Sequence, residues 1–194
     1  MNRTGSLARK TGETDIFVAL DLDGEGVSQV DTGIGFFDHM LSAVAKHGLI
    51  DLTVRVQGDL AVDGHHTVED TGIVLGAALA QALGDKKGIR RVGSCFLPMD
   101  ESLAFCALDI SGRPYLAFDA AFPAEMCGGY ASELTEEFFR AVSVSSGITL
   151  HLKAEGRNTH HMIEALYKAF ARALRDAAAL DPRVKGVPST KGVL

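Results

Sequence analysis

Apolar residues follow two different periods along this chain, one typical of strands and one typical of helices. Alternation of apolar and polar residues predicts a strand at 15–22, and the Asp23-Gly24 pair after it predicts a hairpin turn. Runs in which apolar residues return every three or four positions predict helices, the first of which ends at Gly48. In order, this part of the chain is predicted to contain strands at 15–22 and 27–30, a helix at about 34–47, a strand at 49–56 and a helix at about 65–83.

The remaining sequence repeats this order with one added strand. Its predicted elements are strands at about 91–98, 102–111 and 114–119, a helix around residues 134–142, a strand at 148–153 and a long final helix around residues 163–174. The repetition predicts an α+β fold built from an internally duplicated half-domain, strand-strand-helix-strand-helix, with sheets packed against helices. We place the first half at residues 1–88 and the second half at residues 89–194, in one compact unit with a C-terminal tail at 181–194.

The composition narrows the class of protein. Hydrophobic residues make up 46% and charged residues 23%, which is typical of a folded globular chain rather than a disordered one. The net charge of −6 and the lack of a long basic run argue against nucleic-acid binding. No apolar run is long enough for a membrane span, and the first residues do not form a secretory signal. Cys95, Cys106 and Cys127 form no CxxC pair, so we expect reduced thiols in a cytoplasmic protein.

Two matching His-His-x-x-Glu motifs open the last predicted helix of each half. They are His65, His66 and Glu69 in the first half and His160, His161 and Glu164 in the second. Residues three or four apart share a helix face, so each Glu lies beside both histidines, whereas adjacent histidines point about 100° apart. The paired copies therefore predict a two-metal site built by both motifs. Imidazole and carboxylate together suit Mn, Fe, Co, Ni or Zn better than Ca or Mg.

Further residues extend this predicted site. His39 lies on the helix at about 34–47, and its place in the repeat corresponds to Glu137, so each half offers one additional ligand. Lys168 lies one turn after Glu164 and brings an ammonium group to the same helix face. Other candidate anion-binding residues are Arg90, Arg91, Arg113 and the tail segment STKG at 189–192. His47 is interpreted as a cation or cap at a helix C-terminus, and His151 is left unassigned.

At this point the sequence resembles the imidazoleglycerol-phosphate dehydratase family of histidine biosynthesis. The resemblance runs from about Arg9 to Leu194. The stretches that carry it are DTGIGFFDHML at 31–41, HHTVED at 65–70, SGRPY at 111–115, HHMIEA at 160–165 and STKGVL at 189–194. The resemblance implies a ribosomal protein S5 domain 2-like fold, two Mn²⁺ ions per active site, and a homo-oligomer of octahedral symmetry, a 24-mer, with sites shared between subunits.

The resemblance also assigns roles to individual residues. The implied metal ligands are His39, His65, His66, Glu69, Glu137, His160, His161 and Glu164, with Glu standing at 137 where the family often has His. The implied phosphate-binding residues are Arg91, Arg113, Lys168, Ser189 and Lys191. Glu13 matches the family's acid/base carboxylate. The implied reaction is dehydration of D-erythro-imidazoleglycerol phosphate to imidazole acetol phosphate, with the substrate imidazolate bound between the metals.

Two alternatives share the same metal ligands. One is a di-metal hydrolase of a phosphorylated small molecule, which would use an activated metal-bound water as nucleophile. The other is a non-enzymatic metal-binding protein, in which Arg113, Lys168 and Lys191 would have no role. Release of phosphate separates the first alternative from a dehydratase. Charge reversal at Arg113 separates the second, because a storage protein would be unaffected by it.

Overall fold

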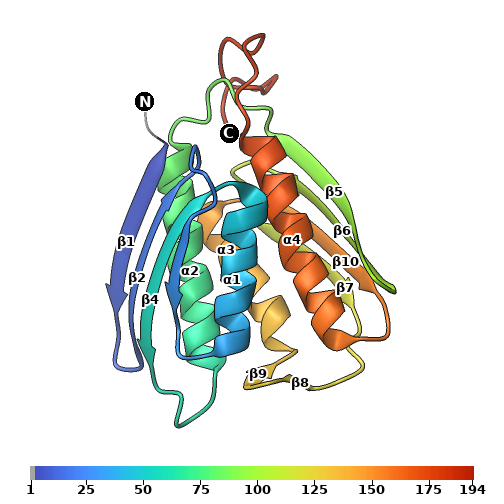
Figure 1. Cartoon of the computed structure of the whole chain (residues 1–194). Helices are drawn as coiled ribbons and strands as arrows, with labels where there is room; N and C mark the ends of the chain where they lie inside the picture. The colour runs from blue at the N-terminus through green and yellow to red at the C-terminus, as the bar shows by residue number, and fades with distance from the viewer. Residues whose placement is uncertain (1–2) are drawn as a thin grey trace.

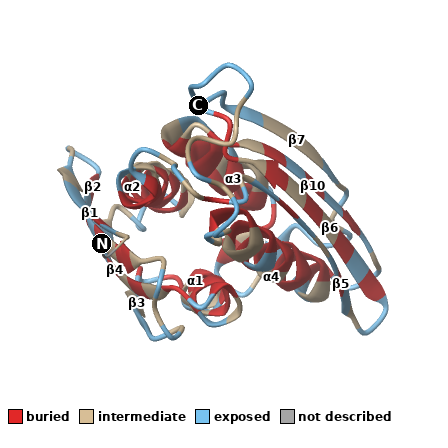
Figure 2. Cartoon of the chain, turned by 90° about the horizontal axis from the view of Figure 1, so that it is seen from above, coloured by how far each residue is buried: buried red, intermediate tan, exposed pale blue. Residues whose placement is uncertain are grey.

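Two four-stranded sheets enclose four helices in the computed structural model, which describes residues 3–194 (Figures 1 and 2). The first half contains β1 (Thr4–Lys10), β2 (Thr14–Asp21), β3 (Ser28–Asp31), α1 (Gly35–Gly48), β4 (Asp51–Gly58) and α2 (His65–Leu83). The second half contains β5 (Val92–Met99), β6 (Ser102–Asp109), β7 (Tyr115–Ala120), β8 (Met126–Cys127), β9 (Tyr130–Ala131), α3 (Leu134–Ser146), β10 (Thr149–Glu155) and α4 (Thr159–Ala178).

Both sheets have the same topology, which agrees with an internal duplication. Their strand orders are β1-β2-β4-β3 and β5-β6-β10-β7. In each sheet the last two strands are parallel and the other neighbours are antiparallel. The predicted α+β class, with sheets packed on helices, is therefore confirmed. The division at residues 88 and 89 remains a prediction.

Two details of the first half differ from the sequence prediction. Strand β1 was not predicted, so the extra strand is not peculiar to the second half. Its only buried residue is Gly5, and an edge strand without an apolar face has no alternation to detect. The hairpin expected at Asp23-Gly24 was also wrong. Strand β3 pairs in parallel with β4, while β2 forms its hairpin with β1.

The core lies between the two sheets, where the helices pack on each other. Alternate residues of the central strands point inward, such as Ile16 and Val18 on β2 and Val54 on β4. The helices α2 and α3 pack together, as do α1 and α4, so helices of different halves form the centre. The large aromatic side chains buried there are Phe37, Tyr130, Phe138, Phe139, Tyr167 and Phe170.

One glycine in each half brings a helix unusually close to its sheet. A Cβ on Gly5 of β1 would lie 2.0 Å from the carbonyl oxygen of Ala78 on α2. A Cβ on Gly93 of β5 would lie 2.1 Å from the carbonyl oxygen of Ala173 on α4. Both contacts are with backbone, which cannot move aside easily, so each position requires glycine. The two contacts are equivalent and are a further sign of duplication.

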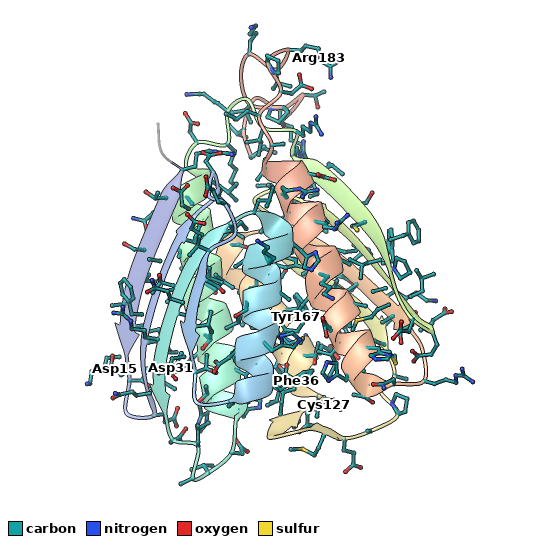
Figure 3. All side chains as sticks on the ribbon, in the orientation of Figure 1. Asp15, Asp31, Phe36, Cys127, Tyr167 and Arg183 are labelled. Atoms are coloured by element: carbon teal, nitrogen blue, oxygen red, sulfur yellow. The ribbon has the colours of Figure 1, made fainter. Side chains whose placement is uncertain are left out.

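All four helices begin at the same end of the molecule (Figure 1). The C-terminal tail lies at the opposite end, where Gly88 donates its N–H to the carbonyl of Gly186 at 3.0 Å. In Figure 3, the labelled side chain of Phe36, at the start of α1, marks one end, and that of Arg183, on the tail, marks the other. Among residues 3–194, no helix is both long and apolar enough to cross a membrane. The three cysteines are free, as predicted.

Candidate metal and catalytic site

Three predicted ligands from both halves meet between α1 and α4. The Nε2 atom of His39 lies 3.3 Å from Oε2 of Glu164, and Nε2 of His160 lies 3.1 Å from the same oxygen. One ligand atom from each of the three residues lies within 4.8 Å of the other two. The Phe36 and His160 rings pack in a T-shaped arrangement, with centroids 5.0 Å apart. A residue of the first half thus completes a cluster that the second half begins.

Glu164 is the buried member of this cluster. Its side chain is only 8% exposed, and Oε1 forms an ion pair with Nζ of Lys168 at 2.6 Å. Burial alone would raise the pKa of Glu164, but the Lys168 ammonium and the His39 ring outweigh it and lower that pKa below its ordinary value. The carboxylate is therefore held ionised. The predicted pairing of Glu164 with Lys168 across one helical turn is present.

The second predicted group lies at the start of α2. Nε2 of His65 lies 3.8 Å from Oε2 of Glu69, and Nε2 of His66 lies 3.7 Å from Oε1 of Glu13. All four side chains are at least one third exposed. Imidazole and carboxylate donors therefore face solvent here, with the predicted acid/base carboxylate beside them.

Short polar side chains define where the helices of the site begin. The Asp63 carboxylate accepts the backbone N–H of His65 at 2.8 Å, and the Asn158 side chain accepts that of His161 at 3.3 Å. On α1, the Asp38 carboxylate accepts both the N–H and the hydroxyl of Thr32. The Asp63 and Asn158 contacts satisfy N–H groups that helix geometry leaves free, while the Asp38 contact ties the segment before α1 to the first turn of that helix.

The turn that carries Glu13 is anchored to α2 through a buried carboxylate. The hydroxyl of Thr14 donates to Oδ2 of Asp70 at 2.6 Å, and Arg9 forms an ion pair with the same oxygen at 2.6 Å. Within the turn, the Thr11 hydroxyl accepts the backbone N–H of Glu13 at 3.1 Å. Asp70 immediately follows Glu69, so the helical turn that carries this candidate ligand also holds the β1–β2 turn.

Two carboxylates outside the predicted set contact the second histidine of each pair. Nδ1 of His66 lies 2.9 Å from Oδ2 of Asp59, and Nδ1 of His161 lies 2.8 Å from Oε2 of Glu101. These hydrogen bonds raise the pKa of both histidines above the ordinary value. Sequence analysis missed both carboxylates. Asp59 lies in the loop before α2, and Glu101 is distant in sequence from His161, so the loop and tertiary structure bring these carboxylates to the rings.

Glu137 is not brought to the other ligands within one chain. It lies in the first turn of α3, half-buried, and its Oε2 is 3.5 Å from Nε of Arg140. The described part of the chain contains one cluster of three potential ligands, and Glu137 does not belong to it. Its role as a ligand remains a prediction, as do the roles of the other site residues.

The predicted phosphate-binding residues are split between the two ends of the molecule. Arg91 makes a two-point contact with the Asp109 carboxylate, at 2.7 and 3.0 Å, and donates to the Pro188 carbonyl at 2.9 Å. Arg113 lies 3.8 Å from the same carboxylate. In the tail, the Ser189 hydroxyl accepts the backbone N–H of Lys191 at 3.2 Å. Lys168 instead contacts Glu164 at the metal end.

The length of α4 separates these two groups. His160 lies at its start and Arg91 binds next to its end, where the Arg91 N–H donates to the Ala177 carbonyl. With a rise of about 1.5 Å per residue, the two ends are about 25 Å apart. The metal-ligand candidates and the Arg91–Arg113–tail group of one chain therefore cannot contact one small substrate together.

The two remaining histidines lie apart from these clusters. His47 lies in the last turn of α1, where burial, and then the neighbouring Lys168 charge, lower its pKa, and its role as a cation or cap of the helix end remains a prediction. His151 is exposed on β10, next to the Tyr115 ring.

A groove of about 540 Å³ borders His65 and runs between the starts of α1, α2 and α3. Its lining includes Gly33, Leu60 and Glu133.

Comparisons with known proteins identify the family of this chain. A family model described as imidazoleglycerol-phosphate dehydratase matches residues 32–174. The imidazoleglycerol-phosphate dehydratase of Symbiobacterium thermophilum is 66% identical over 193 residues, covering 99% of this chain and 93% of that protein. The one from Acetivibrio thermocellus is 61% identical over 195 residues, covering all of both chains.

Solved structures agree as well. The crystal structure of the Staphylococcus aureus imidazoleglycerol-phosphate dehydratase has a TM-score of 0.84 and 41% identity, covering 92% of this chain and 99% of that one. A Pyrococcus furiosus structure of the same enzyme has a TM-score of 0.84 and 35% identity, covering 97% of this chain and 100% of that one. The resemblance found in the sequence motifs is confirmed: the chain belongs to the imidazoleglycerol-phosphate dehydratase family of hydro-lyases.

Proposed function

We propose that this chain dehydrates D-erythro-imidazoleglycerol phosphate to imidazole acetol phosphate and water, in the cytoplasmic biosynthesis of histidine. Membership of the family supports the reaction. The observation that carries the proposal furthest is the convergence of His39, His160 and Glu164, because it joins a histidine of the first half to the His-His-x-x-Glu motif of the second half. The function therefore rests on a site and not on the fold alone.

The proposed cofactor is a pair of Mn²⁺ ions per active site. The donor set fits this ion, since imidazole nitrogens and an ionised carboxylate oxygen converge within 4.8 Å and the Lys168 ion pair keeps Glu164 charged. The residues that would hold the ions are His39, His65, His66, Glu69, Glu137, His160, His161 and Glu164. When bound, Mn²⁺ would lower the pKa of the substrate imidazole and favour its imidazolate form.

Glu13 is the proposed base. Its carboxylate takes a proton from the second carbon of the side chain, counted from the ring, and the first carbon loses its hydroxyl as hydroxide, so that the proton and the hydroxide together make up the water released. The resulting enol tautomerises to the ketone, so the atoms balance as substrate to product plus water. The Asp70 contacts with Thr14 and Arg9 support this role, because they hold the Glu13 turn against the helix that carries His66 and Glu69.

The proposed binding of the substrate's phosphate involves a second chain. Arg91, in the group with Arg113, Ser189 and Lys191, lies about 25 Å from His160 of its own chain. We propose that these residues bind the phosphate at the metal end of a neighbouring subunit, within a 24-mer of octahedral symmetry. Holding the phosphate fixes the position of the reacting carbons relative to Glu13. The separation of the two groups supports shared sites, while the number of subunits rests on the family resemblance.

Metal analysis coupled to a substrate assay tests the function. The purified protein should contain Mn²⁺ and convert imidazoleglycerol phosphate to imidazole acetol phosphate without releasing phosphate, and chelation should abolish turnover. Activity that survives complete metal removal would contradict the metal proposal. Release of phosphate would favour a di-metal hydrolase instead.

Charge reversal at Arg113 tests whether the chain is an enzyme or a metal-binding protein. Arg113→Glu should abolish turnover and leave the metal content unchanged, because Arg113 lies at the end away from the histidines. Mixed oligomers of Arg113→Glu and Glu13→Gln subunits should regain activity, since some sites then combine an intact metal end with an intact phosphate end. Mixed oligomers that remain inactive would rule out shared sites.

A further inference from the structure

In each His-His pair, the second ring is held by a carboxylate from outside the motif. His66 contacts Asp59 through Nδ1, and His161 contacts Glu101 through Nδ1, at 2.9 and 2.8 Å. We infer that Asp59 and Glu101 are positioning residues that fix the tautomer and ring orientation of His66 and His161, so that Nε2 is presented to a metal ion. The inference rests on the proposed di-metal function and adds residues that neither the motif nor the resemblance assigns.

The chemistry of the contact determines the tautomer. An ionised carboxylate can only accept a hydrogen bond, so the proton of the neutral ring must lie on Nδ1. The lone pair then lies on Nε2, which is the atom available to a metal. Ligating histidines usually have such a carboxylate, carbonyl or water partner on their other nitrogen. In their neutral form, both rings are therefore held by these contacts in the tautomer that metal binding through Nε2 requires.

The Nε2 atoms face acidic groups without being bound by them. Nε2 of His66 lies 3.7 Å from Glu13, and Nε2 of His161 lies 3.7 Å from Asp100. These distances exceed a hydrogen bond, so neither nitrogen is occupied. Among residues 3–194, His65 and His160 have no carboxylate hydrogen-bonded to Nδ1. The positioning contact is therefore specific to the second histidine of each motif.

The two carboxylates differ in how firmly they are held. Oε1 of Glu101 accepts the backbone N–H of Arg157 at 3.0 Å, that of Asn158 at 2.7 Å and the Ser102 hydroxyl at 3.0 Å, while Oε2 accepts from His161. Asp59 uses only Oδ2, and its buried Oδ1 has no hydrogen-bond partner in the described chain. Glu101 thus needs both oxygens as acceptors, whereas Asp59 needs one.

This difference predicts unequal effects of two isosteric substitutions on metal affinity, which a purely structural role of the carboxylates would not produce. In Glu101→Gln, the amide oxygen is required by the two backbone N–H groups, so the amide NH₂ faces His161 Nδ1 and forces the proton onto Nε2. In Asp59→Asn, the amide oxygen can replace Oδ2 and keep the tautomer, while Asp59→Ala removes the contact. The two isosteric substitutions should therefore have unequal effects on metal affinity.

The measurement is competition for Mn²⁺ between a chelator and the full-length, metal-loaded protein. Glu101→Gln and Asp59→Ala should weaken Mn²⁺ binding by about 10- to 100-fold, and Asp59→Asn by less than about threefold. Asp119→Ala and Glu155→Gln are matched controls, since both carboxylates are exposed and contact only Lys153. These controls should retain wild-type affinity.

Two outcomes overturn the inference. One is wild-type Mn²⁺ affinity in both Glu101→Gln and Asp59→Ala; the other is equal weakening in these variants and the two controls. If Asp59→Ala does not fold, the contrast between Glu101→Gln and Asp59→Asn decides alone. A wild-type protein that retains no Mn²⁺ would instead contradict the proposed cofactor, so the two failures are distinguishable.

Discussion

The two halves of the molecule share a backbone plan but place their reactive side chains differently. In the first half, the carboxylate on Nδ1 of His66 is Asp59, which follows β4. In the second half, the residue that follows β10 is Gly156, and a Cβ there would lie 2.1 Å from the Ser102 hydroxyl. The carboxylate on His161 comes instead from Glu101, in the β5–β6 turn. The same hydrogen bond is thus built from two different elements.

The hairpin turns show the same divergence. In the β1–β2 turn, Glu13 faces Nε2 of His66, while in the β5–β6 turn Asp100 faces Nε2 of His161 at the same distance. The first turn is tied to its helix by Asp70, and the second by Glu101. Packing restricts the backbone more tightly than it restricts an exposed side chain, so duplicated halves can keep one fold and acquire separate chemical roles.

The first prediction, with the largest expected change, concerns the activity of variants in these two turns. Glu13→Gln should lower kcat by about 10²- to 10⁴-fold with unchanged metal content, because the amide cannot accept the substrate proton. Asp100→Asn is the matched variant, and Asn tolerates the positive φ of 48° at that position. Steady-state kinetics with metal analysis measures both. A comparable loss of kcat in Asp100→Asn would show that both turns take part in the chemistry.

A second prediction tests whether the equivalent glycines of the two halves contribute equally to stability. Gly5→Ala and Gly93→Ala should each lower the free energy of unfolding by about 3 kcal/mol, because each new Cβ would overlap a helix carbonyl. Gly129→Ala is the control, since a Cβ there meets no atom within 4 Å. Chemical unfolding monitored by circular dichroism gives the values. Clearly unequal effects at Gly5 and Gly93 would contradict an equivalent packing role.

The matched glutamates of the two motifs should respond differently in the metal-free protein. Glu164→Gln should lower the free energy of unfolding by about 2 kcal/mol, because it leaves Lys168 without its charged hydrogen-bond partner. Glu69→Gln should cost less than about 0.5 kcal/mol, since its side chain is 43% exposed. Urea unfolding with chelator present makes the comparison. Equal losses would mean that burial does not distinguish the two sites.

The smallest expected effects concern the ends of α1 and α3. The C-cap of α1 is Leu49, at a φ of 53°, while that of α3 is Gly147, at a φ of 71°. Gly147→Ala should lower the free energy of unfolding by about 1 kcal/mol, because a Cβ is strained at positive φ. Leu49→Gly should relieve similar strain and change stability in the opposite direction. Thermal unfolding of both variants checks the signs.

Much of the fold could be predicted because local patterns were strong. The helix at 65–83 was predicted with the bounds that α2 has, since its apolar spacing is regular and glycines flank it. Strand β1 was missed because its buried face consists of Gly5 alone. The predicted partner of β3 was wrong because proximity in the sequence favoured a hairpin with β2. The parallel pairing of β3 with β4 depends instead on where α1 lies.

For the site, the sequence pattern indicated the candidate residues: the paired His-His-x-x-Glu motifs, His39, Lys168 and the basic tail group. Helical spacing accounts for Glu164 beside His160 and Lys168. The tertiary structure was needed to show that His39 joins His160 and Glu164 from the other half and that Asp59 and Glu101 contact the second histidines. It was also needed to place Arg91, Arg113 and the tail at the far end of the molecule. Those contacts join residues distant in sequence, whose positions depend on how two sheets and four helices pack together.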